Sequence, residues 1–127
     1  MSVGIAGKTL LLVDDNPNNL MLFGALLQAN GANVQSAESG EACLEMVQSA
    51  VPDLILLDIQ MPGIDGVETL QRLLQMDAIK GRVPVIALTA NAMDGDCDRL
   101  LAEGFSGYMA KPINTRAFAQ EVAEYLQ

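Results

Sequence analysis

The chain has 127 residues, 50% of them hydrophobic, which suits one globular domain and excludes a disordered chain. Its 7 Lys and Arg stand against 16 Asp and Glu, for a formal net charge of −9, so it lacks the clustered cations with which a protein follows a nucleic-acid backbone. His is absent, so these residues contain neither a catalytic histidine nor a phosphohistidine.

The first half of the chain alternates short apolar runs with longer stretches that have apolar residues at helical spacing. Pro17 and Gly31 flank the first helical stretch, as is typical of helix ends. Ser39 can cap the second helical stretch, and Asp58 follows a strongly apolar run. We therefore expect strands over 9–13, 33–37 and 54–57, and helices over 18–30 and 39–49.

The second half continues the same alternation. Asp94 can cap a short helix that Gly104 ends, and Asn114 can cap the last helix. Thr89 follows the fourth apolar run. We expect helices over 66–76, 94–102 and 114–126, and strands over 83–88 and 106–110.

Five strands that alternate with helices predict an α/β fold with a parallel sheet covered on both faces by right-handed crossovers. We expect a single domain over 1–127, with residues 1–7 as a loose N-terminal segment. In a flavodoxin-like (βα)5 order, 2-1-3-4-5, the first and third strands are neighbours.

Four of the five expected strands end in polar residues that suit a binding site: Asp14 with Asp15, Asp58, Thr89 and Lys111. The carboxyl ends of parallel strands lie along one edge of the sheet, where ligands bind in open α/β folds. Residues far apart in the sequence are therefore expected in one crevice.

Three carboxylates in one crevice repel one another unless a cation neutralises them. Mg²⁺ suits this role because it prefers oxygen ligands and commonly joins carboxylates to a phosphate. Lys111 would pair with a phosphoryl oxygen as a point charge, and Thr89 would donate a hydroxyl hydrogen bond. Since Asp can accept a phosphoryl group covalently, the set predicts a phosphoryl site.

Four motifs in this order resemble the response-regulator receiver family over nearly the whole chain. They are D-D at 14–15, L-L-D-I-Q-M-P-G-I-D-G at 56–66, A-L-T-A at 87–90 and Y-M-A-K-P at 108–112. The resemblance implies a single receiver domain, similar to the chemotaxis regulators, in two-component or phosphorelay signalling.

The resemblance also implies a role for each matching residue of the metal site. Asp58 is similar to the phosphoacceptor and nucleophile, Asp15 to the direct metal ligand, and Asp14 to the second acid, which holds a metal-bound water. The backbone carbonyl of Gln60 resembles the remaining protein ligand. The implied cofactor is Mg²⁺, with Mn²⁺ as a second candidate.

Further positions resemble those that respond to the phosphoryl group. Thr89 and Lys111 resemble the pair that grips its oxygens, and Tyr108 the aromatic switch residue that turns inward. Pro112 resembles a proline that follows a cis peptide bond. Gln60 and Asn91, two residues after Asp58 and Thr89, resemble the positions that tune the lifetime of the phosphoryl group.

The implied function is a phosphoacceptor switch and not an enzyme with a separate substrate. The donor would be a phosphohistidine of a sensor histidine kinase or a histidine phosphotransfer protein, and the fourth and fifth β/α units would form the switched surface. The downstream target stays open, as does a phosphorylation-dependent dimer. The lack of linker residues after Tyr125 favours a stand-alone regulator over a receiver from a hybrid kinase.

Three other functions fit these residues less well. A haloacid-dehalogenase-type phosphatase needs an acid two residues after the nucleophile, where Gln60 stands. A flavodoxin needs a Ser/Thr-rich first loop, where this chain is acidic. A degenerate receiver would lack part of the set at Asp14, Asp15, Asp58, Thr89 and Lys111.

The sequence also bears on location. Cys43 and Cys97 form no CxxC pair and are expected to be free thiols. Neither a secretory leader nor an apolar run of membrane-spanning length is apparent, so we expect a cytoplasmic protein with no membrane contact.

Overall fold

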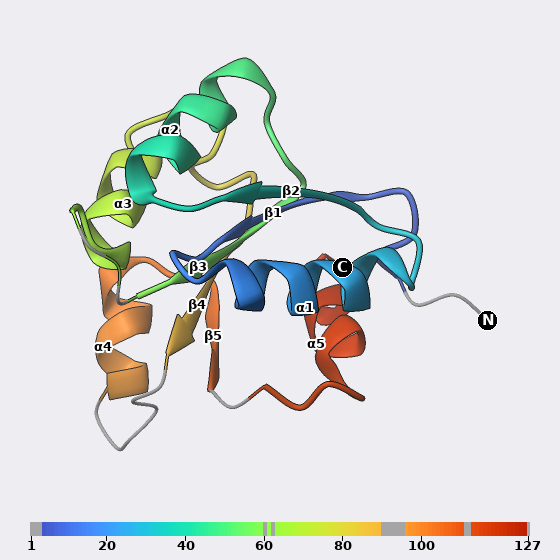
Figure 1. Cartoon of the computed structure of the whole chain (residues 1–127). Helices are drawn as coiled ribbons and strands as arrows, with labels where there is room; N and C mark the ends of the chain where they lie inside the picture. Colours follow the sequence, from blue (N-terminus) through green and yellow to red (C-terminus); the bar gives the residue numbers. More distant parts are fainter. Residues whose placement is uncertain (1–3, 60, 62, 90–95, 111–112, 127) are drawn as a thin grey trace.

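The computed structural model describes residues 4–59, 61, 63–89, 96–110 and 113–126 (Figure 1). Five strands alternate with five helices along the chain. The strands are β1 (Thr9–Val13), β2 (Asn33–Ala37), β3 (Leu54–Asp58), β4 (Val85–Thr89) and β5 (Gly107–Ala110). The helices are α1 (Pro17–Gln28), α2 (Gly40–Ser49), α3 (Gly66–Leu73), α4 (Asp96–Glu103) and α5 (Phe118–Glu124).

The five strands form one parallel sheet in the order β2-β1-β3-β4-β5. The expected fold class and strand order are thus confirmed. The central strands β1, β3 and β4 are almost wholly buried, which explains their continuous apolar sequence. Because β1 lies between β2 and β3, its carboxyl end neighbours that of β3.

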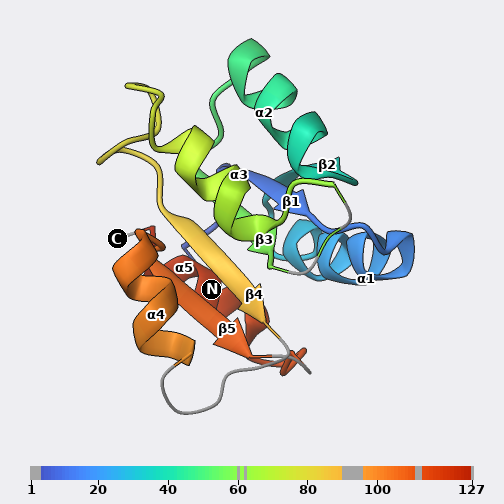
Figure 2. The ribbon, with the colours of Figure 1, turned by 90° about the vertical axis from the view of Figure 1, so that its left-hand side faces the viewer.

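Helices cover both faces of the sheet (Figure 2). On one face, α1 and α5 pack over Leu12, Leu56 and Leu88, and the rings of Phe23 and Phe118 lie 5.3 Å apart. On the other face, the buried residues of α2, α3 and α4 pack over the alternate positions of the same strands. The two cores follow from the two-residue period of a strand.

Polar side chains begin three of the helices. Asn16 caps α1 by accepting a hydrogen bond from the backbone N–H of Asn18, and Ser39 caps α2 through the N–H of Ala42. The expected cap at Ser39 is thus confirmed, whereas Asn16 was not singled out. Gly104, with φ of +120°, follows the end of α4 as expected.

Several expected boundaries were wrong, among them the following three. The strand expected from residue 83 begins at Val85 because Pro84 has no N–H to give to the ladder. The third helix ends at Leu73, and turns follow it. Asn114 does not cap α5: its side chain accepts from the N–H of Arg116 within a turn, and the helix begins at Phe118.

The N-terminal segment is packed where the structure describes it. Ile5 is fully buried in the core under α1 and α5. The N–H of Gly7 donates to the carbonyl of Gly31, and the N–H of Lys8 to that of Ile5. The expectation of a loose segment is therefore wrong for residues 4–7, and residues 1–3 lie outside the described residues. Among the described helices, none has the length and apolar character needed to cross a membrane.

Candidate phosphoacceptor site

Three acidic side chains meet at the carboxyl edge of the sheet. Asp14 and Asp15 follow β1, and Asp58 ends β3 beside it. One carboxylate oxygen from each lies within 4.8 Å of the others. The structure thus brings together the three acids that the sequence predicted to converge.

The donor set fits a hard divalent cation. All three candidate ligands are carboxylate oxygens, and Asp15 is exposed whereas the other two are buried. Two oxygens bound directly to one Mg²⁺ lie at most about 4.2 Å apart, because each bond is about 2.1 Å long. The 4.8 Å within which the three oxygens lie slightly exceeds this limit, so the cluster fits one cation that one of the acids would hold through a metal-bound water.

Asp14 is fully buried, at 0% exposure, and the start of α1 holds it. Its Oδ1 accepts a hydrogen bond of 2.9 Å from the backbone N–H of Asn16. Its Oδ2 accepts one of 3.1 Å from the side-chain amide of Asn19. Such bonds offset part of the cost of burying a carboxylate. Asn19 was missed in the sequence, where its position five residues after Asp14 gives no signal without the turn between them.

Asp58 and Thr89 are nearly as buried, at 5% and 6% exposure. They end the neighbouring strands β3 and β4, where Asp58 pairs with Leu88. Thr89 therefore lies at the same edge of the sheet as the acids, one ladder position beyond Asp58. This agrees with the expected neighbourhood of the two residues.

Asp58 and Thr89 lie on opposite faces of the sheet. Leu56 belongs to the core under α1 and α5, so Asp58, two residues later, lies on that face. Ala87 belongs to the core under α2, α3 and α4, so Thr89 lies on that second face. Tyr108 pairs with Ala87 in the ladder, shares its face, and is 37% exposed. The two candidate switch residues thus share one face.

The start of α3 packs directly against the backbone of Asp58. A Cβ added to Gly66 would lie 2.6 Å from the Asp58 carbonyl oxygen and 2.7 Å from the Cα of Ile59. The N–H of Gly66 donates to the carbonyl of Ile59 at 3.0 Å. No other residue type fits there unless the backbone at Asp58 moves.

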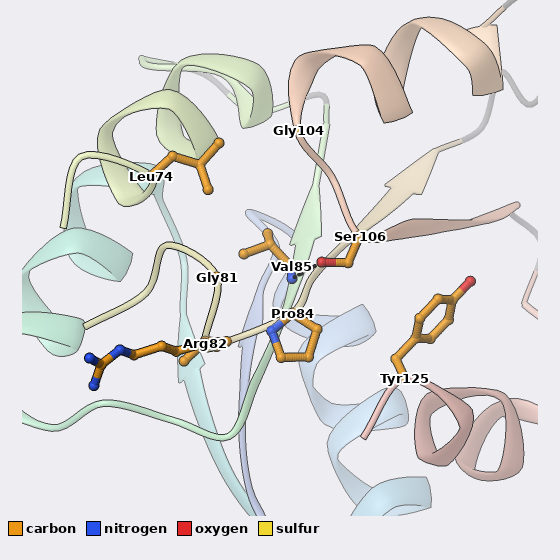
Figure 3. A pocket seen from close by; sticks show the side chains of 9 residues that line it. Leu74, Gly81, Arg82, Pro84, Val85, Gly104, Ser106 and Tyr125 are labelled. Carbon is orange, nitrogen blue, oxygen red and sulfur yellow. Dashed lines mark hydrogen bonds between the residues drawn. The ribbon is translucent and has the colours of Figure 1, made fainter. Parts of the chain in front are cut away.

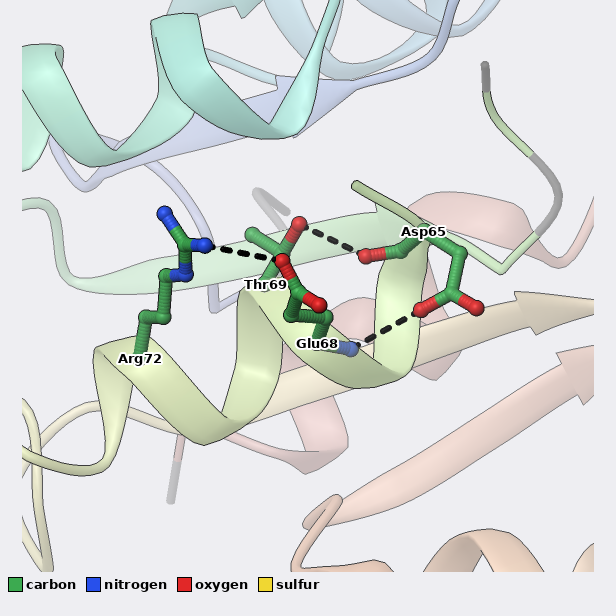
Figure 4. A network of polar contacts seen from close by, with 4 residues as sticks. All are labelled: Asp65, Glu68, Thr69 and Arg72. Atoms are coloured by element: carbon green, nitrogen blue, oxygen red, sulfur yellow. Dashed lines mark hydrogen bonds and ion pairs between the residues drawn. The ribbon is translucent and has the colours of Figure 1, made fainter. Parts of the chain in front are cut away.

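Asp65 caps α3 and thereby stabilises the helix start that packs against the backbone of Asp58 (Figure 4). Its carboxylate accepts a hydrogen bond of 2.9 Å from the N–H of Glu68, and its carbonyl accepts one of 2.8 Å from the hydroxyl of the buried Thr69. The exposed pair of Arg72 and Glu68, 2.9 Å apart, continues the network along the helix. Asp65 thus serves the helix start and is no member of the acidic cluster.

Four predicted site residues lie outside the described residues: Gln60, Asn91, Lys111 and Pro112. The metal-ligand role of the Gln60 carbonyl, the phosphoryl contact of Lys111 and the cis bond before Pro112 remain predictions. The same holds for the lifetime roles of Gln60 and Asn91.

A cavity of about 460 Å³ opens at the opposite, amino end of β4 (Figure 3). Its lining includes Leu74, Val85, Ser106 and Tyr125. Of the predicted site residues that the structure describes, none lines this cavity. The acidic crevice, and not this hollow, is therefore the candidate site.

A family model described as response regulator receiver domain matches residues 10–123. The chain belongs to the response regulator receiver domain family. Receiver domains are the phosphoacceptor switches of two-component signalling, with an acidic pocket that binds Mg²⁺. The acidic cluster of this chain stands at the corresponding edge of the sheet.

Curated relatives are of two kinds. The sensor protein GacS of Pseudomonas syringae is 41% identical over 91% of this chain but only 13% of its own length. The kinase BarA of Escherichia coli K12 is 45% identical over 83% of the chain and 11% of its own length. The polar-differentiation response regulator DivK of Brucella anthropi is 37% identical over 94% of the chain and 96% of its own length. The chain thus spans a small part of the sensor kinases and nearly all of DivK.

Solved structures share the fold across nearly the whole chain. The chemotaxis response regulator CheY4 of Vibrio cholerae has a TM-score of 0.88 at 26% identity, and the match covers 94% of this chain and 98% of that one. The N-terminal domain of a receiver protein from Methanoculleus marisnigri has a TM-score of 0.76 at 35% identity, and covers 95% and 97%. The flavodoxin-like topology expected from the sequence is therefore that of the family.

Proposed function

We propose that this receiver domain accepts a phosphoryl group on Asp58 from a phosphohistidine and passes the signal through the surface of α4, β5 and α5. The observation that supports the proposal most directly is the convergence of Asp14, Asp15 and Asp58 within 4.8 Å at the carboxyl edge of the sheet. Of these three, Asp58 alone ends a strand of the sheet, and it is 5% exposed.

In the proposed reaction, a carboxylate oxygen of Asp58 attacks the phosphorus of the donor. The bond between phosphorus and the imidazole nitrogen breaks, and the nitrogen leaves with the bonding pair. The product is an acyl phosphate on Asp58. Because the chain has no His, the donor histidine lies outside these 127 residues.

Asp14, Asp15 and Asp58 would hold the cation, for which Mg²⁺ is the best fit and Mn²⁺ the alternative. A bound Mg²⁺ would neutralise the charge that gathers when a phosphoryl group meets three carboxylates. Asn16 and Asn19 hold Asp14 in place. Positioning and charge stabilisation are most of what phosphoryl transfer needs from a protein.

Thr89 and Lys111 would gain contacts with the new phosphoryl oxygens, and those contacts would bias the packing of the fourth and fifth β/α units. Tyr108 on β5 is 37% exposed and Leu101 on α4 is 44% exposed. Both lie outside the fully packed core, on the elements proposed to switch. A change of their exposure would alter the surface that a target protein meets.

The donor is proposed to be a sensor histidine kinase or a histidine phosphotransfer protein. The relatives support this class of partner, since GacS and BarA bear the names of sensor kinases and DivK that of a response regulator. The relatives include both contexts in which this receiver could act, the sensor kinases GacS and BarA and the single-domain-length DivK. Activity in the cytoplasm, where such kinases present their phosphohistidine, belongs to the same proposal.

The test is the intact mass of the protein after incubation with Mg²⁺ and a small acyl-phosphate donor. We expect the wild type to gain one phosphoryl group, and to lose this gain when a chelator is present. Asp58→Ala removes the acceptor and should gain none. Asp53→Ala is the matched control, because Asp53 lies just before β3, at its opposite end, and binds the N–H of Thr9.

Two results would contradict the proposal. One is a wild type that stays unmodified with every donor, a phosphorylated histidine phosphotransfer protein included. The other is an Asp58→Ala protein that gains the same mass as Asp53→Ala, which would place the acceptor elsewhere.

A further inference from the structure

The side chain of Asn19 reaches the acidic crevice from the first turn of α1. Its amide donates a hydrogen bond of 3.1 Å to Oδ2 of Asp14, while the other oxygen of Asp14 accepts from the backbone of Asn16. Asn19 is half-buried and Asp14 is fully buried. The amide is therefore the side-chain donor with which α1 holds this carboxylate.

The two hydrogen bonds hold the Asp14 carboxylate at both of its oxygens. A carboxylate held at one oxygen can still rotate about its Cβ–Cγ bond, whereas one held at both is oriented. Each carboxylate oxygen accepts more than one hydrogen bond, so the amide and a metal-bound water can share Oδ2. The hydrogen bond to Asn19 is thus compatible with a cation in the crevice.

An amide also suits the charge of the crevice. Three carboxylates already meet there, and the chain offers only 7 Lys and Arg in all. A neutral donor stabilises the charge of Asp14 without competing with the cation, as a lysine or arginine would by ion pairing. The residue type at position 19 therefore has a physical reason beyond helix formation.

We propose that Asn19 is a positioning residue of the metal site, which orients Asp14 so that the crevice binds Mg²⁺. The inference deepens the proposed function and rests on it. Outer residues that orient a ligand typically change metal affinity by about 10- to 100-fold when they are replaced. Loss of the Asn19 amide is expected to weaken Mg²⁺ binding about ten-fold.

The test is a titration of the whole chain with MgCl2. The NMR chemical shifts of the backbone amides report binding at each step. Asn19→Leu removes the donor and keeps a side chain of similar size. Asn18→Leu is the matched control, since it makes the same change one residue earlier, at an exposed position, and leaves in place the Asn19 amide that donates to Asp14. Asn19→Ala removes the same amide with less bulk, and the dispersion of each spectrum shows whether the variant is folded.

We expect wild type and Asn18→Leu to share one dissociation constant, and both Asn19 variants to bind about ten-fold more weakly. Equal affinity in wild type and in a folded Asn19 variant would overturn the inference. Tighter binding in the Asn19 variants would overturn it as well, because the amide would then compete with the cation. A wild type without any Mg²⁺-dependent shifts would instead overturn the metal site itself and, with it, the inference.

Discussion

Helices α1 and α5 cover one face of the sheet, and helices α2, α3 and α4 cover the other (Figure 2). On the first face, Phe118 is fully buried and its ring lies 5.3 Å from that of Phe23. On the second face, Tyr108 of β5 is 37% exposed. Asp58 lies on the first face, whereas Thr89 and Tyr108 lie on the second.

In the proposed function, this difference separates the chemistry at Asp58 from the response at Thr89 and Tyr108. The close packing of the first face would hold the proposed acceptor in one geometry, because displacement there would open cavities in a dense core. An aromatic ring that is only partly covered can change its packing at a smaller cost in buried area. Both faces meet at the edge of the sheet, where Thr89 lies one ladder position beyond Asp58.

The largest expected effect is a loss of stability, and it is tested by replacing one aromatic residue on each face of the sheet. Phe118→Ala should lower the free energy of unfolding by about 3–5 kcal/mol, since it removes a fully buried ring and leaves a cavity. Tyr108→Ala should lower it by less, about 1–2 kcal/mol, because this residue is already 37% exposed. Urea unfolding of both variants gives the two values.

Tyr108→Ala should also still gain a phosphoryl group under the conditions of the mass test. The stability measurement decides the comparison between the faces. Equal losses of stability in Phe118→Ala and Tyr108→Ala would show that the second face is packed as closely as the first, and the contrast between the faces would not hold.

Much of the fold could be predicted because apolar runs and helical spacing report burial directly. The strands over 9–13 and 33–37 have the bounds expected from the sequence, and Ser39 caps α2 as expected. The convergence of Asp14, Asp15 and Asp58 followed from a general property of parallel sheets, the common edge of their carboxyl ends. Family resemblance then assigned roles that periodicity cannot assign.

What the sequence did not predict depends on the partner that each residue meets in the folded chain. Asn114 has the residue type of a cap, but its side chain serves a turn and α5 begins four residues later. Ile5 looked like part of a loose terminus, yet it completes the core under α1 and α5. Asn19 reaches Asp14 only because the loop between them folds back. The partners of Ile5 are set by tertiary packing, and those of Asn114 and Asn19 by the conformation of a turn, and residue type alone specifies neither.

The next expected effect concerns the contact between α3 and the backbone of Asp58. Gly66→Ala would place a methyl group 2.6 Å from the Asp58 carbonyl oxygen, and backbone atoms cannot rotate away as a side chain can. We expect a loss of about 1–3 kcal/mol in the free energy of unfolding. We also expect slower phosphorylation of the folded protein, because the acceptor must shift. Urea unfolding and the initial rate of mass gain measure the two effects.

Gly24→Ala is the control with the opposite expected sign. Gly24 lies inside α1, and an added Cβ would meet only ordinary contact with Val34 at 3.7 Å. Alanine in a helix interior should stabilise the protein by about 0.5–1 kcal/mol and leave phosphorylation unchanged. If Gly66→Ala behaves in the same way, the close approach of α3 to Asp58 does not constrain the acceptor.

The smallest expected effect is a pH dependence of the free energy of unfolding. It arises on the second face, where Cys43 of α2 is buried among apolar side chains. Burial raises the pKa of the Cys43 thiol from its ordinary value of 9.0 to about 12. Between these values the unfolded chain releases the proton and the folded chain keeps it, so unfolding becomes easier as the pH rises above 9. The stability that the neutral thiol contributes is therefore complete below pH 9 and is lost progressively toward pH 12. At pH 10 the loss should be about 1 kcal/mol.

Cys43→Ala isolates this contribution from the lysines and tyrosines that titrate in the same range. The variant will be less stable at every pH because it leaves a small cavity, but its stability should fall less steeply between pH 8.5 and pH 10 than that of the wild type. Urea unfolding at several pH values gives both slopes. Parallel slopes would mean that the thiol ionises as easily in the folded protein as in the unfolded chain. Water would then reach the second face near α2, and the incomplete cover seen at Tyr108 would extend across that face instead of being confined to its β5 end.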